Sequence, residues 1–179
     1  MRPRALALFV ICLVACVRQP GPRSPEEAFS ALGQAARAAD LGRLFELLDK
    51  GTRWSIMSVF KDQQQTCSLV RAHYPKDRQP RELRRCQLAA GAPDAKAFFV
   101  AYARKHHQAI VEPLARMTAV KARHGSGTRV ELEIAGVRLP FCEEDGLWAY
   151  CGLHERFDRL KVKTARDLSM VRENIEAYR

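Results

Sequence analysis

The stretch TRVELEI, at residues 128–134, has the most regular pattern in the chain. Apolar and charged side chains alternate strictly along it, so Val130, Leu132 and Ile134 share one face of an extended strand. The opposite face carries only charged side chains. This pattern predicts a strand of an antiparallel sheet with one buried face and one solvated face.

The segments around this stretch predict the other strands of the sheet. Residues 117–122 alternate weakly and precede the turn HGSG at residues 124–127. Residues 137–141 continue the alternation on the other side. Residues 147–153 then predict a fourth strand, after a hairpin turn at Asp145-Gly146.

Helical patterns precede the sheet and follow it. The first helix begins at SPEE, residues 24–27, where Ser24 and Glu27 form a capping box and Pro25 suits the first helical position. Asp40 is expected to cap a second helix, which runs to Gly51 as a left-handed cap, and Asp94 is expected to cap another, which runs to Lys105. Further helices are predicted from Thr52 to Tyr74, through Leu83 and Cys86, and over residues 164–179 after a charged link. The predicted fold class is α+β: amino-terminal helices packed on a curled antiparallel sheet of about four strands, with a carboxy-terminal helix.

The amino terminus has the pattern of a secretion signal. Arg2 and Arg4 are followed by eleven uncharged residues, 5–15, which are too few to span a bilayer as a helix. The four residues LVAC, 13–16, resemble the bacterial lipobox, in which the cysteine is lipidated and becomes the first residue of the mature chain. The alternative is an ordinary secretory signal in which Cys16 is incidental.

The lipobox resemblance divides the chain into three parts. Residues 1–15 are the expected lipoprotein signal peptide, residues 16–23 a tether, and residues 24–179 a single α+β domain. Cys16 would carry the palmitate-type acyl anchor, and the protein would lie in the cell envelope, on the periplasmic face of the outer or the inner membrane.

The charge of the chain favours anionic neighbours. Thirty Lys and Arg residues against twenty Asp and Glu give a net charge of +10, which falls to +8 when Arg2 and Arg4 leave with the signal peptide. Phospholipid or lipopolysaccharide head groups are neighbours of this kind. The basic residues form no run of five or more, so no nucleic-acid partner is expected.

Four cysteines remain after Cys12 leaves and Cys16 is lipidated. An even number in an oxidising compartment predicts two disulfides, with three possible connectivities. Sequence spacing favours two local bridges, Cys67–Cys86 and Cys142–Cys151. A turn at Gly146-Leu147 would place the second pair directly opposite, and a turn at Asp145-Gly146 would leave it diagonal. Disulfide geometry favours the first register.

Two stretches resemble nuclear transport factor 2-like, or cystatin-like, domains. SPEEAF at residues 24–29, with Asp40-Leu41, is similar to the opening of secreted members, and EDGLW at residues 144–148 is similar to their late hairpin. The resemblance implies a cone with a pocket between helices and a concave sheet. Enzymes and non-catalytic proteins both use this fold, so it implies no activity. The helical insertion between Pro75 and His107 and the final helix depart from the family pattern.

The residues expected around any such pocket are mostly aromatic. They are Trp54, Tyr102, Trp148 and Tyr150, with His154 after the last strand. Core packing explains aromatic residues at these spacings more often than contact with a ligand does. Neither the adjacent His106 and His107 nor the acidic turn at residues 143–145 has the spacing of a metal site.

Two functions from different classes are compatible with these patterns. The first is a lipid-anchored envelope lipoprotein with a non-catalytic domain, which binds a small apolar ligand or another envelope protein or has a structural role. The second is a small envelope enzyme with His154 or an acidic residue as the base. No catalytic set, metal or cofactor is predicted, and the first function is preferred.

Overall fold

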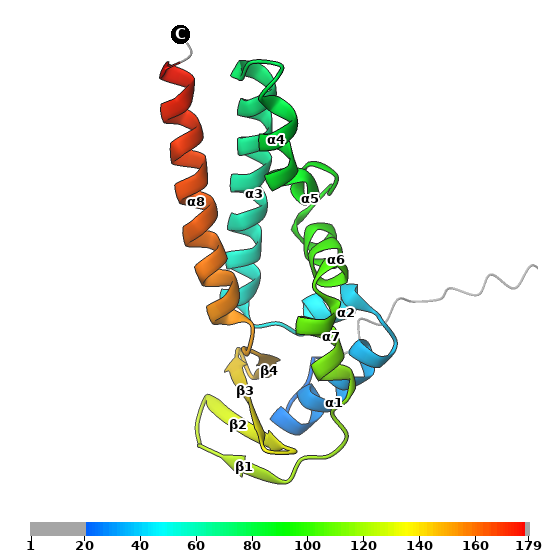
Figure 1. The fold of residues 1–179 in the computed structure, drawn as a ribbon. Coiled ribbons are helices and arrows are strands. Elements are labelled where there is room, and N and C mark those ends of the chain that lie inside the picture. The colour runs from blue at the N-terminus through cyan, green and yellow to red at the C-terminus, as the bar shows by residue number, and fades with distance from the viewer. Residues whose placement is uncertain (1–20, 178–179) are drawn as a thin grey trace, which may run out of the picture.

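The computed structural model of the chain describes residues 21–177 (Figure 1). Helices come first along these residues, a sheet follows, and one long helix ends the chain. The elements are α1 (Pro25–Arg37), α2 (Leu41–Glu46), α3 (Lys50–His73), α4 (Gln79–Leu83), the 3₁₀ turn η1 (Arg84–Cys86), α5 (Gln87–Ala90), α6 (Ala95–Lys105), α7 (His107–Ala115), β1 (Ala122–His124), β2 (Arg129–Ile134), β3 (Val137–Glu144), β4 (Leu147–Tyr150) and α8 (His154–Ala177).

The sheet is antiparallel, open and four-stranded, with the order β1-β2-β3-β4. Val130, Leu132 and Ile134 of β2 are buried, and their charged neighbours along the strand are at least partly exposed. Helix α1 packs against β2, β3 and β4, so it covers the apolar face of the sheet. The α+β class and the carboxy-terminal helix are therefore confirmed.

Helices α3 and α8 lie side by side and run in the same direction, away from the sheet (Figure 1). Near the sheet, the backbone N–H of Asp49 donates to Tyr150, and His154 lies beside Gly51. At the far end, the Nδ2 of Asn174 donates to the Tyr74 hydroxyl at 3.0 Å. Each helix has 24 residues, which corresponds to about 36 Å. We call this parallel pair the stalk and its far end the tip.

The tip has an apolar cluster of its own, separate from the main core. Val70 and Tyr74 of the α3 end pack there with Val171 and Ile175 of α8. The main core lies among α1, α2, α6, α7, the sheet and the lower stalk, and its largest fully buried side chains include Phe98, Phe99, Phe141 and Phe157.

Two strand boundaries differ from the sequence prediction. The strand expected at residues 117–122 is wrong, because β1 covers Ala122–His124 and begins where the Lys121 amide donates to Glu133 in β2 at 2.8 Å. The weak apolar alternation before that point has no pairing partner in the sheet. Strand β4 ends at Tyr150 instead of residue 153, because the chain turns into α8 there.

The expected register of the β3–β4 hairpin is also wrong. Cys142 pairs with Ala149, and Asp145 and Gly146 both have positive φ, 54° and 76°, as in a type I′ turn. Asp-Gly favours this turn strongly, and the diagonal pair still meets the geometric requirement of a disulfide, since the Cα atoms of Cys142 and Cys151 are 6.1 Å apart.

Helix α7 was not predicted from the sequence, and helix α8 begins earlier than predicted. The pattern does not predict α7, which contains Pro113, but Ile110, Val111 and Leu114 are buried and α7 packs against α1. Their burial outweighs the hydrogen bond that proline removes. Helix α8 begins at His154 rather than residue 164, because Phe157, which shares a helical face with Thr164, is fully buried.

Gly51 is not the left-handed cap of the second helix. Helix α2 ends at Glu46, and Gly51 lies in the first turn of α3. A β-carbon at this position would lie 2.8 Å from the His154 ring. The glycine therefore permits the close approach of the amino ends of α3 and α8.

Candidate functional site

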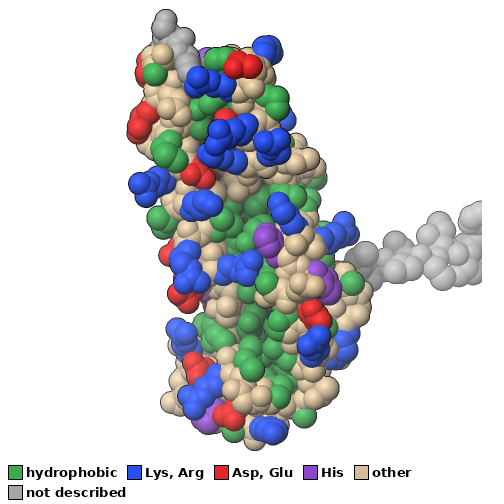
Figure 2. Space-filling view, in the orientation of Figure 1, with side chains coloured by type: hydrophobic (Ala, Val, Ile, Leu, Met, Phe, Trp, Pro, Cys, Tyr) green, Lys and Arg blue, Asp and Glu red, His purple; other side chains and the backbone are tan. Residues whose placement is uncertain are grey.

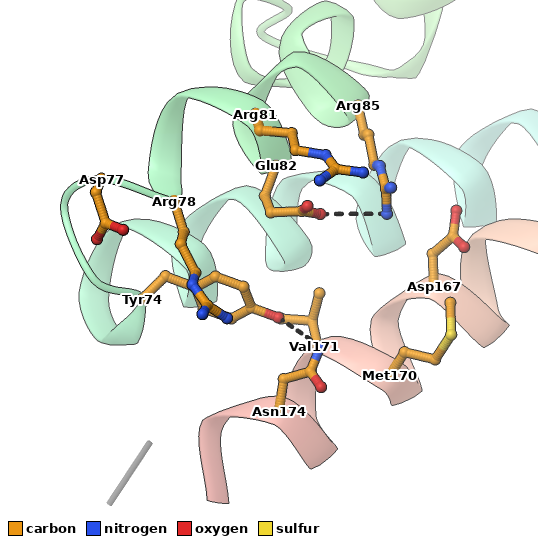
Figure 3. Close-up of a pocket in the computed structure, with 10 residues that line it drawn as sticks. All are labelled: Tyr74, Asp77, Arg78, Arg81, Glu82, Arg85, Asp167, Met170, Val171 and Asn174. Atoms are coloured by element: carbon orange, nitrogen blue, oxygen red, sulfur yellow. Dashed lines mark hydrogen bonds and ion pairs between the residues drawn. The ribbon is translucent and has the colours of Figure 1, made fainter. Parts of the chain in front are cut away.

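A cavity of about 700 Å³ opens at the tip between the α4–η1 segment and α8 (Figure 3). We call it the distal pocket. Its size is within the range of small-molecule sites. The residues that line it are Tyr74, Asp77, Arg78, Arg81, Glu82, Arg85, Asp167, Met170, Val171 and Asn174.

The local sequence brings three arginines to one wall of the distal pocket. Arg78, Arg81 and Arg85 are spaced by three and four residues, so the helical α4–η1 segment directs them to the same side (Figure 3). Pro80 lies in the first turn of α4, where its missing N–H has no cost. Arg85 of this wall forms an ion pair with Glu82 at 3.2 Å.

The opposite wall comes from α8. Asp167, Met170 and Asn174 project from successive turns, and the buried Val171 lies between them (Figure 3). Met170 is one of the exposed large apolar side chains of the described chain. The pocket thus combines guanidinium groups on one wall with a carboxylate and apolar surface on the other.

Covalent and hydrogen-bonded links hold the two walls in place. The Cys67–Cys86 disulfide joins η1 to α3, with the Cα atoms 5.8 Å apart. The side-chain amide of Gln79 donates to the Tyr74 carbonyl at 2.9 Å, and the Tyr74 hydroxyl accepts from Asn174. The pocket is therefore preformed by bonds between α3, the α4–η1 segment and α8.

A second cavity of about 500 Å³ continues the distal pocket along α8. It shares Arg85, Asp167 and Met170 with the first and extends to Lys163 and Leu160. The two cavities form a groove beside the stalk. These arginines were not among the residues expected to form a site, although their spacing of three and four residues is a readable signal in the sequence.

The predicted cysteine pairs are confirmed. Cys67 bonds to Cys86 and Cys142 bonds to Cys151, so both bridges are local. The expected lipidation site, Cys16, lies outside the described residues.

The expected aromatic residues lie in different surroundings. The Trp54 side chain is 65% exposed on α3, whereas Trp148 and Tyr150 belong to the main core. Tyr102 of α6 packs against Phe157 and accepts a hydrogen bond from Arg156 at 3.3 Å. Burial raises the pKa of Tyr150 to about 12.

His154 has one carboxylate nearby, which sequence spacing did not reveal. Its Nδ1 lies 3.6 Å from Oδ1 of Asp49, beyond hydrogen-bonding distance. Asp49 is only 5% exposed and caps α3 by accepting hydrogen bonds from the Thr52 amide and hydroxyl. The Asp49 carboxylate thus already has a structural role as the cap of α3, and His154 lies next to that cap.

The acidic hairpin turn also serves the amino end of α3. Both carboxylate oxygens of Glu144 accept from the Lys50 amide, at 3.0 and 2.9 Å. Asp145 forms an ion pair with the Lys50 ammonium, which lowers the pKa of Asp145. Within residues 21–177, no group of three or more His, Cys, Asp or Glu side chains is arranged to hold a metal ion.

Comparisons with known proteins found no matching family model, no matching curated protein and no matching solved structure. The nuclear transport factor 2-like resemblance therefore stays a prediction. Along the described part of the chain, none of the helices combines the length and apolar character needed to cross a membrane.

Proposed function

We propose that this protein is a lipid-anchored lipoprotein of the cell envelope, with a folded domain that binds a ligand or another envelope protein without catalysing a reaction. The observation that carries the proposal is the LVAC pattern at residues 13–16, which follows two arginines and an uncharged run. The acyl anchor on Cys16 is the expected membrane contact.

The two disulfides support an oxidising compartment. Structural cystines persist in secreted and periplasmic proteins and are rare in the cytosol. Both bridges form between cysteines of the folded domain, and Cys67 and Cys86 are buried. An envelope address accounts for all four cysteines without metal binding or redox catalysis.

The described start of the chain supports a short connection to the membrane. The Trp148 amide donates to the Pro22 carbonyl at 2.8 Å, and the Arg23 amide donates to the Glu27 carboxylate at 2.8 Å. The domain therefore holds the chain from residue 22 onward. Five residue steps separate Cys16 from Gly21, which span at most about 18 Å when fully extended.

An envelope enzyme with His154 as the base is the alternative, and the proximity of His154 and Asp49 is the one observation in its favour. The Asp49 carboxylate already accepts two hydrogen bonds within the α3 cap. The non-catalytic function is therefore preferred.

The lipid anchor is tested by replacing Cys16 with serine in the full-length chain. We expect Cys16→Ser to lack the mass of the acyl chains. It should also leave the detergent phase in phase partitioning, because each buried methylene of an acyl chain contributes about 0.8 kcal/mol to the free energy of membrane binding. Cys12→Ser is the matched control and should partition like the unmodified sequence. A Cys16→Ser protein of unchanged mass in the detergent phase would show that the proposal is wrong.

A further inference from the structure

We propose that the distal pocket binds a phosphate ester that also carries hydrogen-bond donors, such as a phosphorylated amino alcohol or polyol. This proposal deepens the binding role proposed above by naming a site and a ligand class. It does not depend on the lipid anchor.

Positive charge is concentrated in the segment that forms one wall of the distal pocket. Residues 71–86 contain six basic and two acidic side chains, a formal charge of +4 with His73 neutral. Figure 2 shows Lys and Arg side chains gathered over α4 near the tip. Within this segment, Arg78, Arg81 and Arg85 line the pocket together with Asp77 and Glu82, which leaves the lining of this wall with a formal charge of +1.

The arginine side chains of this wall have the chemistry that binds phosphate groups. A guanidinium group presents a planar fork of N–H donors that matches two oxygens of a phosphate group. In Figure 3, the Arg81 and Arg85 side chains lie next to each other on the same side of the cavity. Glu82 pairs with Arg85 and holds it at the pocket wall.

The opposite wall restricts the rest of the ligand. Asp167 on α8 faces the cavity from the other side and lines both parts of the groove. Its carboxylate repels a second anionic group and accepts hydrogen bonds from hydroxyl or ammonium groups. Met170 and Val171 offer apolar surface next to it. A phosphate at one end and donors at the other therefore match both walls.

Bonds between its elements make the distal pocket rigid. The Cys67–Cys86 bridge and the Asn174–Tyr74 hydrogen bond hold both walls before a ligand arrives. Preformed sites lose less conformational entropy on binding. A disulfide beside the arginine wall thus favours binding as well as stability.

Calorimetric titration of the full-length protein in neutral detergent tests the proposal. The soluble probe is O-phosphoethanolamine, and the lipid probe is dihexanoyl phosphatidylethanolamine below its micellar concentration. Both carry a phosphate ester and an ammonium group, and the tighter of the two identifies whether the natural ligand is a soluble ester or a lipid head group. Inorganic phosphate, which lacks the ammonium group, should bind more weakly than either.

The variant Arg81→Ala/Arg85→Ala should weaken binding of the tighter probe by at least about tenfold. It removes hydrogen bonds from guanidinium to phosphate groups, and hydrogen bonds between charged groups contribute more to affinity than neutral ones. The matched control is Arg166→Ala/Arg172→Ala, which removes the same charge from exposed positions of α8 outside the pocket lining. We expect the control to bind within about twofold, since water and salt screen exposed charges that do not line the pocket.

Circular dichroism and a count of free thiols establish that each variant is folded with both bridges intact. Absence of binding of both ester probes to the unmodified sequence would overturn the proposal. Equal losses in the two double variants would overturn it too, because diffuse charge alone would then bind the anion. Either result leaves lipidation at Cys16, which is measured by mass, untouched.

Discussion

Replacing Cys67 and Cys86 together by alanine removes the covalent link between α3 and η1. The bridge joins residues 19 positions apart. For a loop of this length, the chain-entropy model assigns roughly 3 kcal/mol of stability to the cross-link. Both side chains are buried, so the two missing sulfur atoms also leave a small void that costs on the order of 1 kcal/mol. We therefore expect the free energy of unfolding to fall by about 3–4 kcal/mol.

Urea unfolding followed by far-ultraviolet circular dichroism measures this loss, and amide hydrogen exchange locates it. Exchange should accelerate most in the α4–η1 segment, which lies outside the main core. The matched control, Cys142→Ala/Cys151→Ala, opens a loop of sequence separation 9 and should lose roughly 2.5 kcal/mol with unchanged exchange at the tip. A loss below about 1 kcal/mol in the Cys67/Cys86 variant, or unaltered exchange in α4, would refute this reasoning.

Two further predictions concern Tyr150. Gly152→Ala would place a methyl group against the Tyr150 phenol and should destabilise the fold by about 1–3 kcal/mol in thermal unfolding. The control Gly91→Ala, where the nearest neighbour of the added methyl group is 3.8 Å away, should change the unfolding midpoint little. Equal midpoints of the two variants would contradict the packing around Gly152. Because burial raises the Tyr150 pKa to about 12 from about 10, the folded state keeps a proton that the unfolded state loses, so stability should fall as pH rises above about 10. Tyr150→Phe should show a weaker alkaline decline in urea unfolding between about pH 9 and 11, and parallel declines would contradict the assignment.

Local signals in the sequence predicted much of this fold. Ser24, Asp40 and Asp94 were expected to cap helices, and each accepts a hydrogen bond from the backbone amide three residues later. Capping depends on neighbours in the chain, and so does the alternation of residues 128–134. The bounds of β1 and the presence of α7 depend on partners distant in sequence, and their prediction failed.

The candidate site was less predictable than the fold. Arg81 and Asp167 face one pocket only because α3 and α8 run in the same direction, and no local pattern encodes that direction. The same limit applies to the approach of His154 to Asp49, which are 105 residues apart. The cysteine pairs were predictable because each bridge closes a short segment.

The shared direction of α3 and α8 also makes their backbone dipoles add instead of cancelling. The two amino ends lie together near the sheet, where Asp49 and Glu144 accept from the first amides of α3 and Glu155 lies in the first turn of α8. The two carboxyl ends lie together at the tip and contribute about one negative charge in total. The +4 of residues 71–86 exceeds the sum of that contribution and the formal charge of −2 on residues 167–177 of α8, so this segment keeps the described tip electropositive in spite of the helix dipoles.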